Sequence, residues 1–165
     1  MFRAFQLLYL MLPVYAANLA APFARVLPGV PQPISPRWLG SHKTWRGCAL
    51  AVLAATLTAW LQSLAQWHGS LIGYDDWLVL GVACGAAAMA GDSAKSFVKR
   101  RLGIAPGKPW IPADQLDYVV GGLLALSAWH RFGAADVAIV LAVSFVGSLA
   151  VNPLSARIGI KDTPW

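Results

Sequence analysis

The chain has 165 residues, of which 58% are hydrophobic and 12% are charged, and its mean hydropathy is +0.57. A soluble domain carries about 25% charged residues, so most of this chain is expected to lie in lipid. This hydropathy excludes a soluble nucleic-acid-binding protein despite the net charge of +6, and we expect one multi-pass membrane domain over residues 1–165.

Apolar stretches separated by polar segments predict an all-α integral membrane protein with about five transmembrane helices. The stretches run over residues 4–21, 47–67, 77–90, 116–129 and 134–151. A hydrocarbon core about 30 Å thick takes roughly 20 helical residues. The third and fourth stretches reach that length only if they extend into the polar motifs at their ends, which would place those motifs on helix ends near the membrane surface.

The positive charges alternate between the polar segments. The segments 22–46, 91–115 and 152–165 hold 11 of the 13 Lys and Arg residues. The positive-inside rule therefore predicts an N-terminus outside the cell and a C-terminus in the cytoplasm. An odd number of spans also puts the two ends on opposite sides, so we expect a cell-membrane protein whose basic segments face the cytoplasm.

Two features precede the second apolar stretch. Asn18 lies within the first stretch, where its amide could bond to another helix or touch a ligand. A Pro-rich run over 28–36 cannot be helical, and we interpret it as a stiff segment that positions the motif after it. That motif supplies Lys43 and Arg46, which serve either as phosphate-binding bases or as simple membrane anchors.

The strongest motif is Gly-Asp-Ser-Ala-Lys-Ser-Phe-Val-Lys-Arg-Arg, residues 91–101. If the helix continues through it, Asp92, Ser96 and Lys99 share one face, and Lys95 is one turn from both Asp92 and Lys99. An acid, a hydroxyl and several bases on one face suit a metal-bound polyphosphate, because carboxylates bind Mg²⁺ and bases neutralise phosphate oxygens. The Lys and Arg residues could instead act only as the positive charges that orient the protein in the membrane. Asp92 does not fit that interpretation, because an ionisable residue beside an apolar span indicates function.

A pair of acids opens the fourth apolar stretch. Asp114 and Asp117 are three residues apart, so both can face the same way. Capping of the helix N-terminus would explain one of them. As a pair they could complete a metal site with Asp92, since metal-assisted phosphoryl chemistry gathers two or three carboxylates on one ion.

These motifs together resemble the CDP-archaeol synthase family and, more distantly, phosphatidate cytidylyltransferase. The resemblance rests on GDSAKSFVKRRLGIAPGKPW, on DQLDYVVGGLL, on LGSHKTWRG and on the element from Asn18 to Pro22. It implies five transmembrane helices and a cytoplasmic site. It also implies an enzyme that transfers the cytidylyl group of CTP to a membrane lipid phosphate, with Mg²⁺, giving CDP-lipid and pyrophosphate for phospholipid synthesis. Many members carry Asp where Ser41 stands, so Ser41 receives no role.

The resemblance assigns metal binding and catalysis to three carboxylates, namely Asp92, Asp114 and Asp117. The candidate residues for binding CTP and the lipid phosphate are Lys43, Arg46, Lys95, Ser96, Lys99, Arg100 and Asn18. The expected partners are CTP, a phosphorylated lipid and the bilayer, with no nucleic acid. A small anion transporter or channel-like protein without nucleotidyl transfer is the alternative, which we favour less because no charge falls mid-span.

Overall fold

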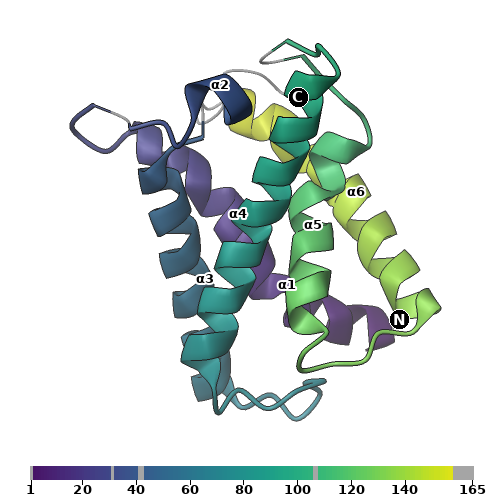
Figure 1. Cartoon of the computed structure of the whole chain (residues 1–165). Helices are drawn as coiled ribbons and strands as arrows, with labels where there is room; N and C mark the ends of the chain where they lie inside the picture. The colour runs from purple at the N-terminus through teal and green to yellow at the C-terminus, as the bar shows by residue number, and fades with distance from the viewer. Residues whose placement is uncertain (1, 31, 41–42, 106–107, 158–165) are drawn as a thin grey trace.

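The computed structural model describes residues 2–30, 32–40, 43–105 and 108–157. Its elements are α1 (Phe2–Ala20), η1 (Ala21–Arg25), α2 (Pro36–Leu39), α3 (Trp45–Ala65), α4 (Trp77–Arg101), α5 (Ala113–Leu126) and α6 (Ala134–Arg157) (Figure 1). The five long helices overlap the five apolar stretches, so the all-α expectation is confirmed. Ser41 lies outside the described residues.

In the described part of the chain, four segments are long and apolar enough to cross a membrane. They are Phe2–Arg25, Trp45–Ala65, Trp77–Arg101 and Ala134–Arg157. Helix α5 has 14 residues, or about 21 Å at 1.5 Å per residue, which is shorter than a hydrocarbon core of about 30 Å. The count of five spans therefore stays a prediction.

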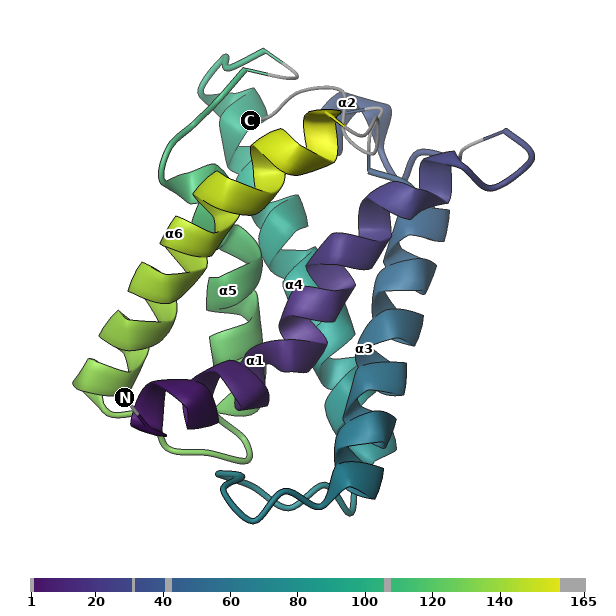
Figure 2. The same ribbon diagram turned by 180° about the vertical axis from the view of Figure 1, so that it is seen from behind.

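The connections between helices are sorted between the two ends of the bundle. Those from η1 to α3 and from α4 to α5 lie at one end, and those from α3 to α4 and from α5 to α6 lie at the other (Figure 1). Helix α1 begins and α6 ends at opposite ends of the bundle (Figure 2). The described parts of the three segments rich in Lys and Arg, which are 22–46, 91–115 and 152–157, therefore lie toward one end.

Glycines let the central helices approach closely. A Cβ atom on Gly85 of α4 would lie 2.6 Å from the Cα atom of Val52 in α3. In the same helix, Gly91 faces the backbone carbonyl of Asp117 in α5 with no room for a side chain. Small residues permit such backbone contacts between membrane helices. The contact at Gly91 sets the polar start of α5 against the polar half of α4.

The polar motif over residues 91–101 forms the C-terminal part of α4 and ends with the helix, as the sequence predicts. Helix α4 continues nine residues beyond Asp92, to Arg101, or about 14 Å at 1.5 Å per residue. The last turns are held by short α2, because the Trp38 ring stacks on Phe97 at 5.8 Å and the Arg101 guanidinium lies 4.8 Å from the Trp38 ring. Asp92 is thus set inside the bundle, at the level where α5 begins.

Candidate active site

The three candidate carboxylates converge on one side chain, the ammonium group of Lys95. Lys95 Nζ lies 3.3 Å from Asp92 Oδ1 in its own helix. Across the helix interface it lies 3.0 Å from Asp114 Oδ1 and 2.8 Å from Asp117 Oδ2. The carboxyl side chains are only 5–19% exposed, so water screens these ion pairs less than surface pairs. Asp92, Asp114 and Asp117 therefore lie together around a lysine, and the metal site predicted for them stays a prediction.

Two further lysines complete this group of charges. Lys43 Nζ forms an ion pair with Asp92 Oδ2. Lys99 Nζ lies 2.9 Å from Asp114 Oδ2 and donates to the backbone carbonyl of Lys108 at 2.7 Å. We call the three aspartates with Lys43, Lys95 and Lys99 the Asp–Lys cluster. Its formal charges cancel, so a triphosphate gains little net attraction there unless further positive charge accompanies it.

Backbone groups fix two of the carboxylates. The Trp110 N–H donates to Asp114 Oδ2 at 2.6 Å, and the Tyr118 N–H donates to Asp117 Oδ1 at 2.6 Å. Hydrogen bonds to a charged acceptor are shorter and stronger than neutral ones. Asp114 accepts this bond from the segment before α5 and pairs with two lysines, so its partners are not those of a helix-capping residue.

The Pro-rich run positions Lys43, as its sequence suggested. The Ile34 N–H donates to the Lys43 carbonyl at 2.8 Å, and the Trp45 N–H donates to the Gln32 carbonyl at 3.2 Å. Between them, Thr44 is the N-cap residue of α3, and its Oγ1 accepts a hydrogen bond from the Gly47 N–H at 3.1 Å. These bonds hold Lys43 at the start of α3, from where it reaches Asp92 in α4.

Four other candidate residues do not take part in the ion pairs of the Asp–Lys cluster. Arg46 Nη1 donates to the Pro28 carbonyl at 2.9 Å. Ser96 Oγ donates to the backbone carbonyl four residues earlier at 2.9 Å, so its hydroxyl serves its own helix. Arg100 Nε is buried without a hydrogen-bond partner among the described residues. Asn18 lines a groove between α1 and α6.

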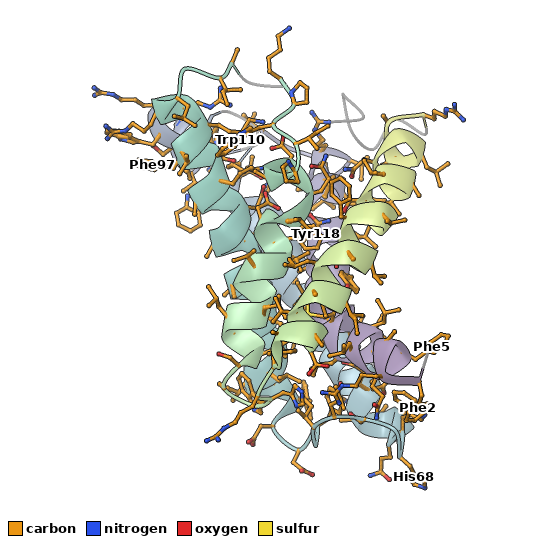
Figure 3. All side chains as sticks on the ribbon, turned by 90° about the vertical axis from the view of Figure 1, so that its right-hand side faces the viewer. Phe2, Phe5, His68, Phe97, Trp110 and Tyr118 are labelled. Carbon is orange, nitrogen blue, oxygen red and sulfur yellow. The ribbon has the colours of Figure 1, made fainter. Side chains whose placement is uncertain are left out.

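Sequence reasoning missed that groove, whose volume is about 250 Å³. Two hydroxyl pairs lie in it, with Tyr15 Oη 2.8 Å from Ser144 Oγ and Tyr118 Oη 3.3 Å from Ser148 Oγ. Figure 3 shows Tyr118 deep in the bundle, between the end that carries Phe97 and Trp110 and the end that carries Phe2 and His68. The spacing of Ser144, Gly147 and Ser148 on one face of α6 was the available signal.

The donor set can be compared with the needs of Mg²⁺. Three carboxylates supply the oxygen ligands that this ion prefers. Within the described ranges, however, no group of three His, Cys, Asp or Glu residues is arranged to hold a metal ion. The carboxylates surround the Lys95 ammonium at 2.8–3.3 Å, whereas Mg²⁺ binds oxygen at about 2.0–2.1 Å. The residues fit the ion chemically, provided that Lys95 leaves the centre.

The fold and the Asp–Lys cluster are typical of a helical membrane protein with a buried polar site between its helices. Comparison with known proteins then gives the particular family. The family model described as CarS-like, CDP-archaeol synthase, matches residues 1–165. The chain belongs to this family, as the sequence resemblance implied.

Individual relatives agree with the family match. The chain is 38% identical to a CDP-archaeol synthase of Methanosphaerula palustris, covering 94% of this chain and 100% of the relative. It is 35% identical to one of Halobacterium salinarum, covering 94% and 93%. A solved structure of an intramembrane enzyme for archaeal membrane lipids biosynthesis has a TM-score of 0.72 and 31% identity, covering 87% of this chain and 90% of that one.

These matches give the activity of the chain. It is a CTP-dependent cytidylyltransferase that acts on a membrane lipid phosphate. The reaction produces a CDP-lipid and pyrophosphate, as the resemblance implied. The transporter alternative is not favoured, because the matched family and the matched structure are enzymes of lipid synthesis.

Proposed function

We propose that the Asp–Lys cluster is the catalytic centre for cytidylyl transfer and that Mg²⁺ is required. The observation that carries this proposal is the meeting of three carboxylates from α4 and α5 around one cation, the Lys95 ammonium. The relatives are CDP-archaeol synthases, so an archaeol-type phosphate is the first acceptor to test.

Asp92, Asp114 and Asp117 would hold the metal. The ion supplies Lewis-acid stabilisation of the charge on the triphosphate oxygens. The Lys95 ammonium lies between the three carboxylates, so they would hold a divalent ion only with Lys95 displaced from that position. Lys95 would then be available to neutralise a phosphate oxygen, together with Lys99 and Lys43.

The remaining chemistry is positioning and charge stabilisation. An oxygen of the lipid phosphate attacks the α-phosphorus of CTP, the bond to the bridging oxygen breaks, and pyrophosphate leaves. A phosphate monoester is already largely dianionic near neutral pH, with a second pKa of about 6. A strong general base is therefore not needed, and the lysines lower the repulsion between the two anionic substrates.

We propose that the Asp–Lys cluster faces the cytoplasm, where CTP is found. The support is the sorting of the connections, since the described parts of the segments 22–46, 91–115 and 152–157, which hold ten of the 13 Lys and Arg residues, lie toward one end of the bundle. Helix α5 would be a fifth, shortened crossing that begins at the cluster. Its 14 residues leave space within the membrane depth for the polar substrate groups. The N-terminus of the chain would then lie outside the cell.

The direct test uses purified protein in detergent with labelled CTP, a panel of lipid phosphates, and Mg²⁺ or a chelator. Asp92→Asn, Asp114→Asn and Asp117→Asn should each lose most transfer of label to lipid while remaining membrane-inserted. Lys99→Ala should chiefly raise the KM for CTP. Asp75→Asn, in the connection at the opposite end, is the matched control. Full activity in all three Asn variants, or full activity with chelator, would reject the metal role.

A further inference from the structure

A groove runs along the side of the bundle between α1 and α6, where Figure 2 shows the two helices diverging in front of α5. Four residues of α1 between Leu8 and Leu19 line it, together with six residues of α6 between Val143 and Asn152 and with Tyr118 of α5. Nine residue steps along α6 correspond to about 14 Å at 1.5 Å per residue. An elongated groove of about 250 Å³ suits a chain-shaped ligand better than a compact one.

The rims and the floor of this groove differ in chemistry. Leu19, Val143 and Val151 line it and are 48%, 38% and 39% exposed. Both α1 and α6 belong to segments long and apolar enough to span a membrane, so these rims would meet lipid. The floor carries the buried hydroxyls of Ser144 and Ser148, which are 4% and 8% exposed. These hydroxyls are already paired with Tyr15 and Tyr118, so the floor does not require a polar occupant along its whole length.

Tyr118 connects the groove to the Asp–Lys cluster. Its backbone N–H donates to Asp117 Oδ1 at 2.6 Å, while its hydroxyl lies 3.3 Å from Ser148 Oγ in the groove. Ser148 Oγ also donates to the backbone carbonyl of Gln115 at 3.4 Å. The Gln115 side chain is fully buried, and its amide nitrogen and oxygen have no hydrogen-bond partner among the described residues. Leaving such groups unpaired is unfavourable, so Gln115 is an unsatisfied polar group next to Ser148, although it does not itself line the groove.

We infer that this groove binds one hydrocarbon chain of the lipid phosphate acceptor, with the polar backbone of the lipid at the level of Tyr118 and Gln115. The inference rests on the proposed function of the Asp–Lys cluster. In this arrangement the chain lies along the apolar rims and remains continuous with the bilayer. The negatively charged phosphate enters beside Asp117, where Lys95 and Lys99 supply the complementary charge.

Gly147 gives a specific way to fill the groove. It lines the groove, and a Cβ atom built on it meets nothing within 4 Å. Gly147→Phe should therefore occupy the groove without moving the helices. Val146→Phe is the matched control, because Val146 is 65% exposed and does not line the groove. It places the same ring on the neighbouring surface of α6.

The kinetic experiment compares a long-chain dialkylglycerol phosphate with a dihexyl analogue too short to extend along the groove. We expect Gly147→Phe to raise the KM for the long-chain substrate at least fivefold, with the KM for CTP and for the short analogue unchanged. Val146→Phe should change none of these values. Equal effects of the two variants, or equal effects on both lipids, would overturn the inference.

A binding experiment without CTP separates this inference from the proposed reaction. The probes are a dialkylglycerol phosphate with a photoreactive diazirine in one chain and the matching neutral dialkylglycerol, each in nanodiscs. The phosphate probe should label the groove-lining residues of α1 and α6, and Gly147→Phe should remove that labelling. No labelling, or equal labelling by the neutral probe, would contradict the inference. Labelling by the phosphate probe in a protein without CTP turnover would support the groove and reject the reaction.

Discussion

Lys95 and Asp117 face each other across the interface of α4 and α5, with Lys95 Nζ 2.8 Å from Asp117 Oδ2. The same ammonium group reaches Asp92 and Asp114. A protein side chain thus occupies the centre of the carboxylate group that we propose as the metal site. Binding of a divalent ion and binding of a triphosphate should therefore depend on each other. The reason is that Lys95 would leave its carboxylate partners and pair with a phosphate group when both ligands bind.

Replacing Lys95 tests this exchange. Lys95→Met should lose most cytidylyl transfer but should bind Mn²⁺, used as a spectroscopic probe, at least tenfold more tightly than the wild type when no nucleotide is present. The reason is that the ammonium no longer competes for the three carboxylates. Electron paramagnetic resonance of free Mn²⁺ measures the affinity.

The control for this experiment is Lys108→Met, since Lys108 contributes its backbone carbonyl to Lys99. Removal of one partner from a buried ion pair can destabilise a protein by about 3–5 kcal/mol, so thermal unfolding of each variant is recorded in parallel. Unchanged Mn²⁺ affinity in a folded Lys95→Met protein would show that Lys95 does not compete for the ion.

Gly91 should be essential for the geometry of the cluster. A side chain there would press on the backbone carbonyl of Asp117 and separate α4 from α5. A misplacement of about 1 Å can lower the rate about 100-fold, so we expect Gly91→Ala to reduce the turnover number strongly. Gly133→Ala is the control, because its nearest contact would be Asp136 at 3.9 Å. Similar turnover in both variants would show that the close contact is dispensable.

The bases near the start of α3 should differ in their effects. Lys43 pairs with Asp92, whereas Arg46 donates to the Pro28 carbonyl. Lys43→Ala should therefore raise the KM for CTP more than Arg46→Ala does. The main effect of Arg46→Ala should be to loosen the segment before α2. Steady-state kinetics at varied CTP, with limited proteolysis of the same proteins, distinguish the two effects. A larger KM change for Arg46→Ala would mean that this arginine turns toward substrate.

The opposite end of the bundle has its own ion pair. Arg3 Nη2 lies 2.6 Å from Asp136 Oδ2 and joins α1 to α6. The Arg3 side chain is 42% exposed, and exposed pairs contribute little, so Arg3→Ala should lower the melting temperature by only about 1–3 °C. Cytidylyl transfer should persist. Loss of transfer with an unchanged melting temperature would assign Arg3 a role in the reaction that its position does not suggest.

The sequence by itself determined the positions of the long helices and the identity of the three carboxylates. Hydropathy is a local property, so each apolar stretch from 4–21 to 134–151 overlaps an observed helix. Residue spacing also predicted Lys95 one turn from Asp92. This spacing holds because the helix continues through residues 91–101, as the length needed to cross a membrane suggested. The family resemblance added the reaction, which the comparisons with relatives bear out.

Only the tertiary structure decided what those residues contact. The Gly91 contact sets α5 against α4 and makes Lys95 the centre of the carboxylates, while Arg46 and Ser96 bond elsewhere. The groove depends on Tyr15 meeting Ser144, 129 residues apart. Hydropathy and spacing act along one helix, whereas these contacts depend on how closely neighbouring backbones approach, which local sequence does not encode.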